Sequence, residues 1–181
     1  APMSGGQIPA YVDARKAFMQ ETELQGAVDL ERLPRFAETL ASDKADVVAS
    51  LRFAKAENGQ RTITGHLQVT TELVCQRCLE SLPVNWEDDI ALVLLEDECL
   101  AERLEPEWDP WVWNEQKLTL ASLIEEQLLL SLPVVVYHDD PKCADKLGYV
   151  PATQHAGEQE ETEKENPFAV LKALKKNDLT D

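Results

Sequence analysis

The sequence predicts an α+β fold in which helices cover the apolar face of an antiparallel β-meander of three or more strands. Two observations support this: apolar and polar residues alternate along three stretches, and apolar residues on either side of them have helical spacing. With 181 residues, of which 44% are hydrophobic, the chain can bury one core, so a single domain is expected.

Short elements are expected ahead of the meander. Residues 11–20 can form a helix and residues 23–28 a strand. The apolar residues that follow have helical spacing, which predicts a helix over residues 34–41. Pro34 fits in its first turn, where a backbone N–H has no partner within the helix.

Three alternating stretches make up the meander. The first covers residues 47–53, and Asn58 with Gly59 supplies a tight turn into the second. The second covers residues 62–73, and one of its faces consists of Ile63, Gly65, Leu67, Val69, Thr71 and Leu73. The third keeps the same alternation over residues 84–94, so the string CQRC lies at a hairpin turn.

Another helix is expected after the meander. Thr119 can cap it and Pro133 ends it. Its apolar face consists of Leu120, Leu123, Ile124 and Leu128. Glu125 and Glu126 are expected on its solvated face, although adjacent carboxylates are also candidates for general acid or base catalysis.

Four residues have the spacing of a zinc site. Cys75 and Cys78 lie at the hairpin turn, where two thiols can face one cation. His138 and Cys143 follow a short apolar run later in the chain. Thiolate and imidazole are preferred zinc ligands, so the pattern predicts a zinc knuckle with four protein ligands.

Two other interpretations of these residues stay open. Cys75 and Cys78 can be half-buried thiols, with His138 an ordinary loop histidine. They can also form a redox dithiol, although thioredoxin-like C-x-x-C motifs open a helix. Pro83 and the alternation after it predict a strand instead, which makes the redox interpretation weaker.

The charge of the chain restricts its partners. It has 34 acidic residues and 17 basic ones, for a net charge of -17. Such a field repels phosphate and attracts basic proteins, so direct contact with RNA is expected to be limited. The longest apolar stretch, residues 128–137, is too short to cross a membrane, and no signal peptide is evident. Four cysteines without export are typical of a cytoplasmic protein.

Tryptophans cluster in the most acidic part of the chain, residues 80–109 and just beyond. Charge runs are usually solvated faces, but aromatic anchors in an acidic field also suit docking of a basic partner. Trp86 falls on an apolar strand face and is expected in the core. Trp108, Trp111 and Trp113 are therefore the candidates for partner binding.

The ends of the chain differ in composition from its centre. We expect an N-terminal segment at residues 1–22, a domain at 23–151, a flexible acidic linker at 152–165 and an amphipathic helix at 166–176. Phe168, Leu171 and Leu174 share the apolar face of that helix, with Lys172 and Lys175 beside them. These five residues are expected to bind a partner; the alternative is that the helix packs on its own domain.

Three strings in this sequence, in this order and spacing, resemble the YceD family of large ribosomal RNA subunit accumulation proteins: LVCQRCLESLPV, LPVVVYHDDPKC and NPFAVLKALKK. The resemblance covers residues 24–176. It implies a bacterial cytoplasmic protein needed for normal accumulation of large-subunit ribosomal RNA. Cys99 and the string WDPWVW depart from the family pattern.

The expected function is a non-catalytic factor for large ribosomal subunit biogenesis. It would act on the pre-ribosomal large subunit mainly through basic ribosomal or assembly proteins. One alternative is a zinc-dependent hydrolase of precursor rRNA with Glu125 as its base, and another is a thiol-based redox-sensing module. Four protein ligands would close the zinc to substrate, which favours a structural role for the metal.

Overall fold

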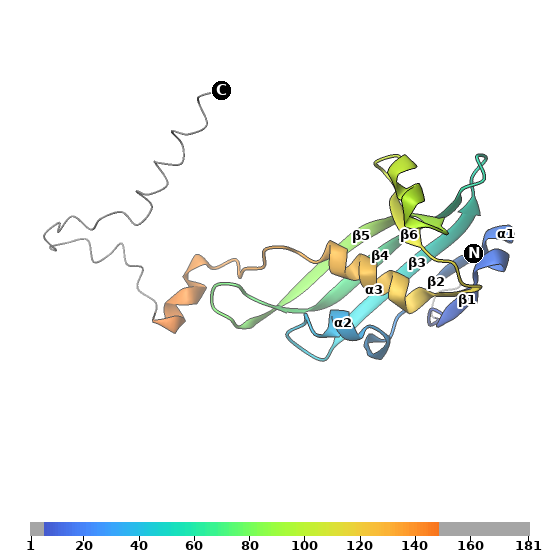
Figure 1. Ribbon diagram of the computed structural model, residues 1–181. Helices are drawn as coiled ribbons and strands as arrows, with labels where there is room; N and C mark the ends of the chain where they lie inside the picture. The colour runs from blue at the N-terminus through green and yellow to red at the C-terminus, as the bar shows by residue number, and fades with distance from the viewer. Residues whose placement is uncertain (1–5, 149–181) are drawn as a thin grey trace, which may run out of the picture. The chain divides into compact units, whose positions relative to one another are not determined.

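The structure is a computed structural model and describes residues 6–148 (Figure 1). The chain divides into two units, Ala1–Ala144 and Asp145–Asp181. The first unit carries the sheet and its core, and of the second only residues 145–148 are described. The predicted acidic linker and C-terminal helix lie outside the described residues. No helix in the described part is long and apolar enough to cross a membrane.

A five-stranded sheet of order β2-β3-β4-β5-β6 forms the body of the first unit. Its strands are β2 (Glu23–Ala27), β3 (Ala45–Lys55), β4 (Arg61–Val74), β5 (Ser81–Leu95) and β6 (Asp109–Val112). The first four pair in antiparallel fashion, which confirms the predicted α+β fold and its meander.

The fifth strand pairs differently from the rest. β6 runs parallel to β5, because the chain crosses back through the 3-10 helix η2 (Glu98–Arg103) before it enters the sheet. The alternation pattern predicts a strand but carries no information on the direction of its pairing, so this parallel edge was not predicted.

Two glycines allow the long β3, β4 and β5 strands to form. Gly59 has a φ of +85°, and the amide of Ala56 donates to the carbonyl of Gln60 at 2.8 Å, which closes the predicted turn. At Gly65, a Cβ would lie 2.0 Å from the carbonyl oxygen of Ser50 on β3. A side chain at position 65 would therefore clash with the backbone of β3, which is why glycine fits there.

The N-terminal helix is shorter than predicted. Residues 11–13 form the strand β1 (Tyr11–Asp13), which pairs with β7 (Lys117–Thr119), and only α1 (Ala14–Met19) is helical. The carboxylate of Asp13 accepts from the amide of Lys16 at 2.9 Å and caps α1. A pairing partner late in the chain thus overrides the local helical pattern.

Helix α3 (Leu120–Ser131) lies across one face of the sheet (Figure 1). It buries the predicted residues Leu120, Leu123, Ile124 and Leu128 against alternate residues of β3, β4 and β5. Thr119 precedes the helix, but its side chain makes no capping hydrogen bond, contrary to the prediction. Trp86 packs on the same core, and its Nε1 donates to Ser131 Oγ at 3.1 Å.

Glu125 does not lie on the solvated face of α3, so that prediction was wrong. Its side chain is buried, and its Oε1 accepts from the amides of Arg35 at 2.8 Å and Phe36 at 3.2 Å. These amides begin α2 (Pro34–Ala37), which follows the 3-10 turn η1 (Leu30–Arg32) and ends well before the predicted residue 41. The carboxylate therefore caps α2 from another helix.

Candidate metal centre

The turn between β4 and β5 forms a knuckle. The last pair of the two strands is Val74 with Ser81, and the turn is closed by two backbone hydrogen bonds. The amide of Cys75 donates to Glu80 at 2.9 Å, and the amide of Leu79 donates to Cys75 at the same distance. Leu79 takes a left-handed φ of 61°, as such a tight turn requires. We refer to residues 75–80 as the knuckle.

The segment after α3 runs along this knuckle. The amide of Gln76 donates to Val136 O at 2.9 Å, and its side-chain amide donates to Val134 O at 3.0 Å. The guanidinium of Arg77 lies over the ring of Tyr137, 4.3 Å from its centroid. These contacts bring His138 to the knuckle, and none of them was predicted, because sequence spacing gives no signal for backbone pairing between irregular segments.

The fourth residue of the site comes from the 3-10 helix η3 (Pro141–Leu147), which carries Cys143. Asp140 fixes the start of this turn, since its carboxylate accepts from the amide of Lys142 at 2.9 Å. Its carbonyl also accepts from the amide of Cys143 at 3.2 Å. Cys143 is buried as a result.

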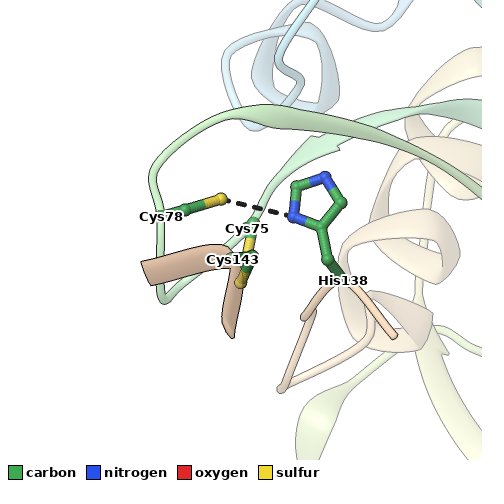
Figure 2. A group of neighbouring side chains, drawn as sticks. All are labelled: Cys75, Cys78, His138 and Cys143. Carbon is green, nitrogen blue, oxygen red and sulfur yellow. Dashed lines mark hydrogen bonds between the residues drawn. The ribbon is translucent and has the colours of Figure 1, made fainter. Parts of the chain in front are cut away.

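The structure brings together all four residues predicted to bind metal (Figure 2). The ligand atoms of Cys75, Cys78, His138 and Cys143 all lie within 4.8 Å of one another. Cys78 Sγ is 3.3 Å from His138 Nδ1, and Cys75 Sγ is 4.0 Å from Cys143 Sγ. A tetrahedral ion with metal–sulfur bonds of about 2.3 Å needs ligands roughly 3.8 Å apart. The group therefore has the size and donor chemistry to hold such an ion.

Hydrogen bonds favour the thiolate form of Cys75. Burial alone would raise its pKa, but backbone amides of Cys78, Arg77 and His138 donate to it, as does the His138 side chain, and they lower the pKa to about 5. Amides that donate to a cysteine sulfur are suited to a metal-bound thiolate, because they disperse its negative charge.

Cys143 has the opposite tendency. Burial raises the pKa of its thiol, and contact with the sulfurs of Cys75 and Cys78 raises it further. Three thiols this close cannot all ionise without a cation among them, since each thiolate opposes the next. A bound divalent ion would remove this penalty and would deprotonate all three.

The residues predicted to bind a partner are not part of this cluster. Trp111 and Trp113 are half-buried and pack against the main core, while Trp108 is half-buried beside β6. Trp113 Nε1 donates to Lys117 O at 2.9 Å. Cys99 is exposed and is not a member of the group. Phe168, Leu171, Leu174, Lys172 and Lys175 lie outside the described residues.

Comparison with known proteins assigns the chain to a family. The sequence model of the large ribosomal RNA subunit accumulation protein YceD matches residues 63–175, which is more than half of the chain. The chain is also 27% identical over 175 residues to the large ribosomal RNA subunit accumulation protein YceD of Haemophilus influenzae, and 93% of this chain and 97% of that protein are covered. No solved structure matches it. By the match over residues 63–175, which include all four residues of the metal centre, the chain belongs to the YceD family.

Proposed function

We propose that this protein is a non-catalytic cytoplasmic factor that supports large ribosomal subunit biogenesis and the accumulation of large-subunit ribosomal RNA. The observation that carries the proposal is the family match, which spans residues 63–175 and is supported by similarity over nearly the whole length of a curated relative. The name of that relative states its role in large-subunit ribosomal RNA accumulation.

We further propose that the protein acts mainly through basic protein partners. Its net charge is -17, so it repels naked RNA and attracts the basic proteins that ribosomal subunits contain. Trp108, Trp111 and Trp113 each keep part of the ring accessible, which leaves them available as docking residues. The C-terminal residues Phe168 and Leu171, with their neighbours, are a second docking candidate on sequence grounds.

Zinc is the metal we propose for the site. Three thiolates and one imidazole form a donor set that zinc prefers, and they leave no position for a substrate or an activated water. A closed site of this kind stabilises structure. Its role here would be to fix the knuckle to the segment that follows α3.

The hydrolase and redox alternatives have less support. The carboxylate of Glu125, the proposed base, accepts from two backbone amides of α2 and serves as a cap. Cys78 is followed by β5 and not by a helix, so it lacks the helix N-terminus that activates thioredoxin-like thiols. The redox alternative would be favoured if the purified protein bound no metal and if Cys75 and Cys143 formed a disulfide that a reductant could reverse.

The test is complementation of a strain that lacks the gene. The expected result is a low ratio of large-subunit to small-subunit rRNA in that strain, which the wild-type gene restores. A normal ratio in the strain without the gene, or no restoration by the wild-type gene, would contradict the proposed function.

A further inference from the structure

The segment at residues 134–138 has two backbone edges, and the knuckle occupies only one of them. Val134 O and Val136 O both accept from Gln76, and His138 Nδ1 lies 3.3 Å from Cys78 Sγ. In an extended chain, alternate residues direct their N–H and C=O groups to the same side. These three residues therefore face the knuckle, as their contacts show.

The backbone groups of the two residues between them have no contact of this kind, although the Tyr137 ring lies under the Arg77 guanidinium of the knuckle. In the described part of the chain, the backbone N–H and C=O groups of Val135 and Tyr137 make no hydrogen bond. Side chains along this edge are also open to solvent: Val134 is 88% exposed, Val135 57% and Tyr137 41%. The segment thus presents a row of free backbone groups flanked by apolar side chains. We call this the open edge.

Proteins normally protect such an edge with lysine, proline, a bulge or a covering loop, because it can pair with another chain. Within the described residues, no lysine, bulge or covering loop protects the backbone at Val135 and Tyr137. The contacts of Gln76 and His138 hold this backbone against the knuckle. An edge that is held to the knuckle on one side and has free backbone groups and exposed valines on the other is suited to accept a further strand.

We propose that the open edge binds an extended segment of a basic protein by β-strand addition, through the backbone groups of Val135 and Tyr137. This inference rests on the proposed function, and it names how and where a protein partner is held. An extended peptide fits because it alone offers a matching row of backbone donors and acceptors. RNA offers no such row, and its phosphates are repelled by a chain of charge -17.

A basic partner is also favoured over a second copy of this chain. Two copies would each carry -17, so their long-range interaction is repulsive, whereas a basic segment is drawn to the same surface. Apolar side chains of that segment would cover Val135, which is 57% exposed, and the part of Tyr137 that Arg77 leaves open.

The test compares two variants at one position in the full-length protein. Val135→Pro removes the free N–H and places a ring on the open edge, while the knuckle side of the segment is untouched. Val135→Ala is the matched control, since it shortens the same side chain but keeps the N–H. Metal content and melting temperature of both variants are measured first, so that only folded protein enters the comparison.

The probe is the RNA-free protein fraction of purified large ribosomal subunits. Wild-type protein is expected to bind it, Val135→Pro to lose about tenfold or more in affinity, and Val135→Ala to lose clearly less. Hydrogen exchange is the second measurement: the amides of Val135 and Tyr137 should become protected upon binding. The amide of Gln76, already bonded to Val136 O on the knuckle side, should change little.

Each outcome decides between the alternatives. A folded Val135→Pro variant that binds as wild type does, or amides of Val135 and Tyr137 that stay unprotected, would overturn the open edge as the binding site. A dimer that Val135→Pro disrupts would assign the edge to a second copy instead. Complementation separates the two proposals: if wild type restores rRNA and Val135→Pro does so equally, the function stands and the edge does not.

Discussion

Cys75 is the residue on which the proposed metal centre would depend most. It accepts hydrogen bonds from three backbone amides and from His138, and it lies 4.0 Å from Cys143. Its backbone also closes the knuckle at both ends, through Glu80 and Leu79. A change at this one side chain therefore affects both the ligand set and the turn that presents it.

We expect Cys75→Ser to reduce bound zinc well below one ion per chain and to lower the melting temperature by roughly 5–10 °C, because part of the folding free energy comes from the metal. Elemental analysis and thermal unfolding test this. Cys99→Ser is the matched control, because Cys99 is exposed and outside the cluster, and it should change neither quantity. Wild-type protein without stoichiometric metal, and with no response to chelation, would contradict the prediction.

His66 makes stability depend on pH. On the solvent face of the sheet, its Nδ1 lies 2.7 Å from Asp89 and its Nε2 lies 2.9 Å from Glu87. The hydrogen bond to Asp89, then that to Glu87, raises the pKa of His66. A raised folded pKa means that the stabilising contribution is fully present below the unfolded value of about 6.5 and is lost as pH rises through the folded value.

The stability lost in His66→Gln should therefore be larger at pH 5.5 than at pH 9. Urea unfolding at the two pH values measures this difference. Thr70→Gln, on the same exposed face of β4, is the control and should show no such pH dependence. An equal loss at both pH values in His66→Gln would show that the protonated imidazole contributes nothing.

At the scale of elements, α2 is the clearest case of a helix that depends on another. Its first amides, from Arg35 and Phe36, donate to Glu125 on α3. The neighbouring Glu126 instead pairs with the Arg35 guanidinium near the surface. Two adjacent glutamates thus have different roles, which follow from the side of α3 to which each points.

Glu125→Ala should cost about 2 kcal/mol of unfolding free energy, because it leaves the buried amide of Phe36 and the partly buried amide of Arg35 without an acceptor. Glu126→Ala is the matched control and should cost less than about 1 kcal/mol, since a solvent-exposed ion pair contributes little. Denaturant unfolding of the two variants compares them directly. Similar costs for both would show that the capping of α2 by Glu125 has little effect on stability.

Sequence patterns predicted the elements that local periodicity determines. The alternation in β4, the Asn58-Gly59 turn and the apolar face of α3 were all correct, because burial on one face imposes the period of the strand or helix. The cysteine and histidine spacing likewise indicated which four residues the structure brings together. Three features were not predicted: the parallel pairing of β6, the strand at 11–13 and the short length of α2. They depend on partners far along the chain, and such contacts leave no pattern in the local sequence.

The molecule as a whole is strongly acidic. Its charge of -17 acts over the entire surface and does not depend on any one site. Under the proposed function, the open edge and the half-buried tryptophans would supply local contacts, while the net charge would select among partners before contact is made. We therefore expect the protein to bind RNA much more weakly than it binds basic proteins.

Binding to naked large-subunit rRNA should be weak and should vanish at modest salt, because few lysines are available to offset repulsion from the phosphates. Filter binding or electrophoretic mobility over a salt series measures it. The RNA-free protein fraction of the same subunits serves as the comparison and should bind at physiological salt. Tight binding to the naked rRNA under that condition would contradict a mechanism based on protein partners.

The order of the four proposed metal ligands along the chain has a consequence for synthesis. Cys75 and Cys78 leave the ribosome early, whereas Cys143 follows β5, β6, β7 and α3. At about 5–20 residues per second, several seconds of translation separate the first thiol from the last. The metal centre can close only after every strand of the sheet has been made. A filled site would therefore mark a chain whose sheet is complete. A chain whose synthesis stopped before Cys143 would lack one ligand, and the contacts that position residues 134–138 would be incomplete.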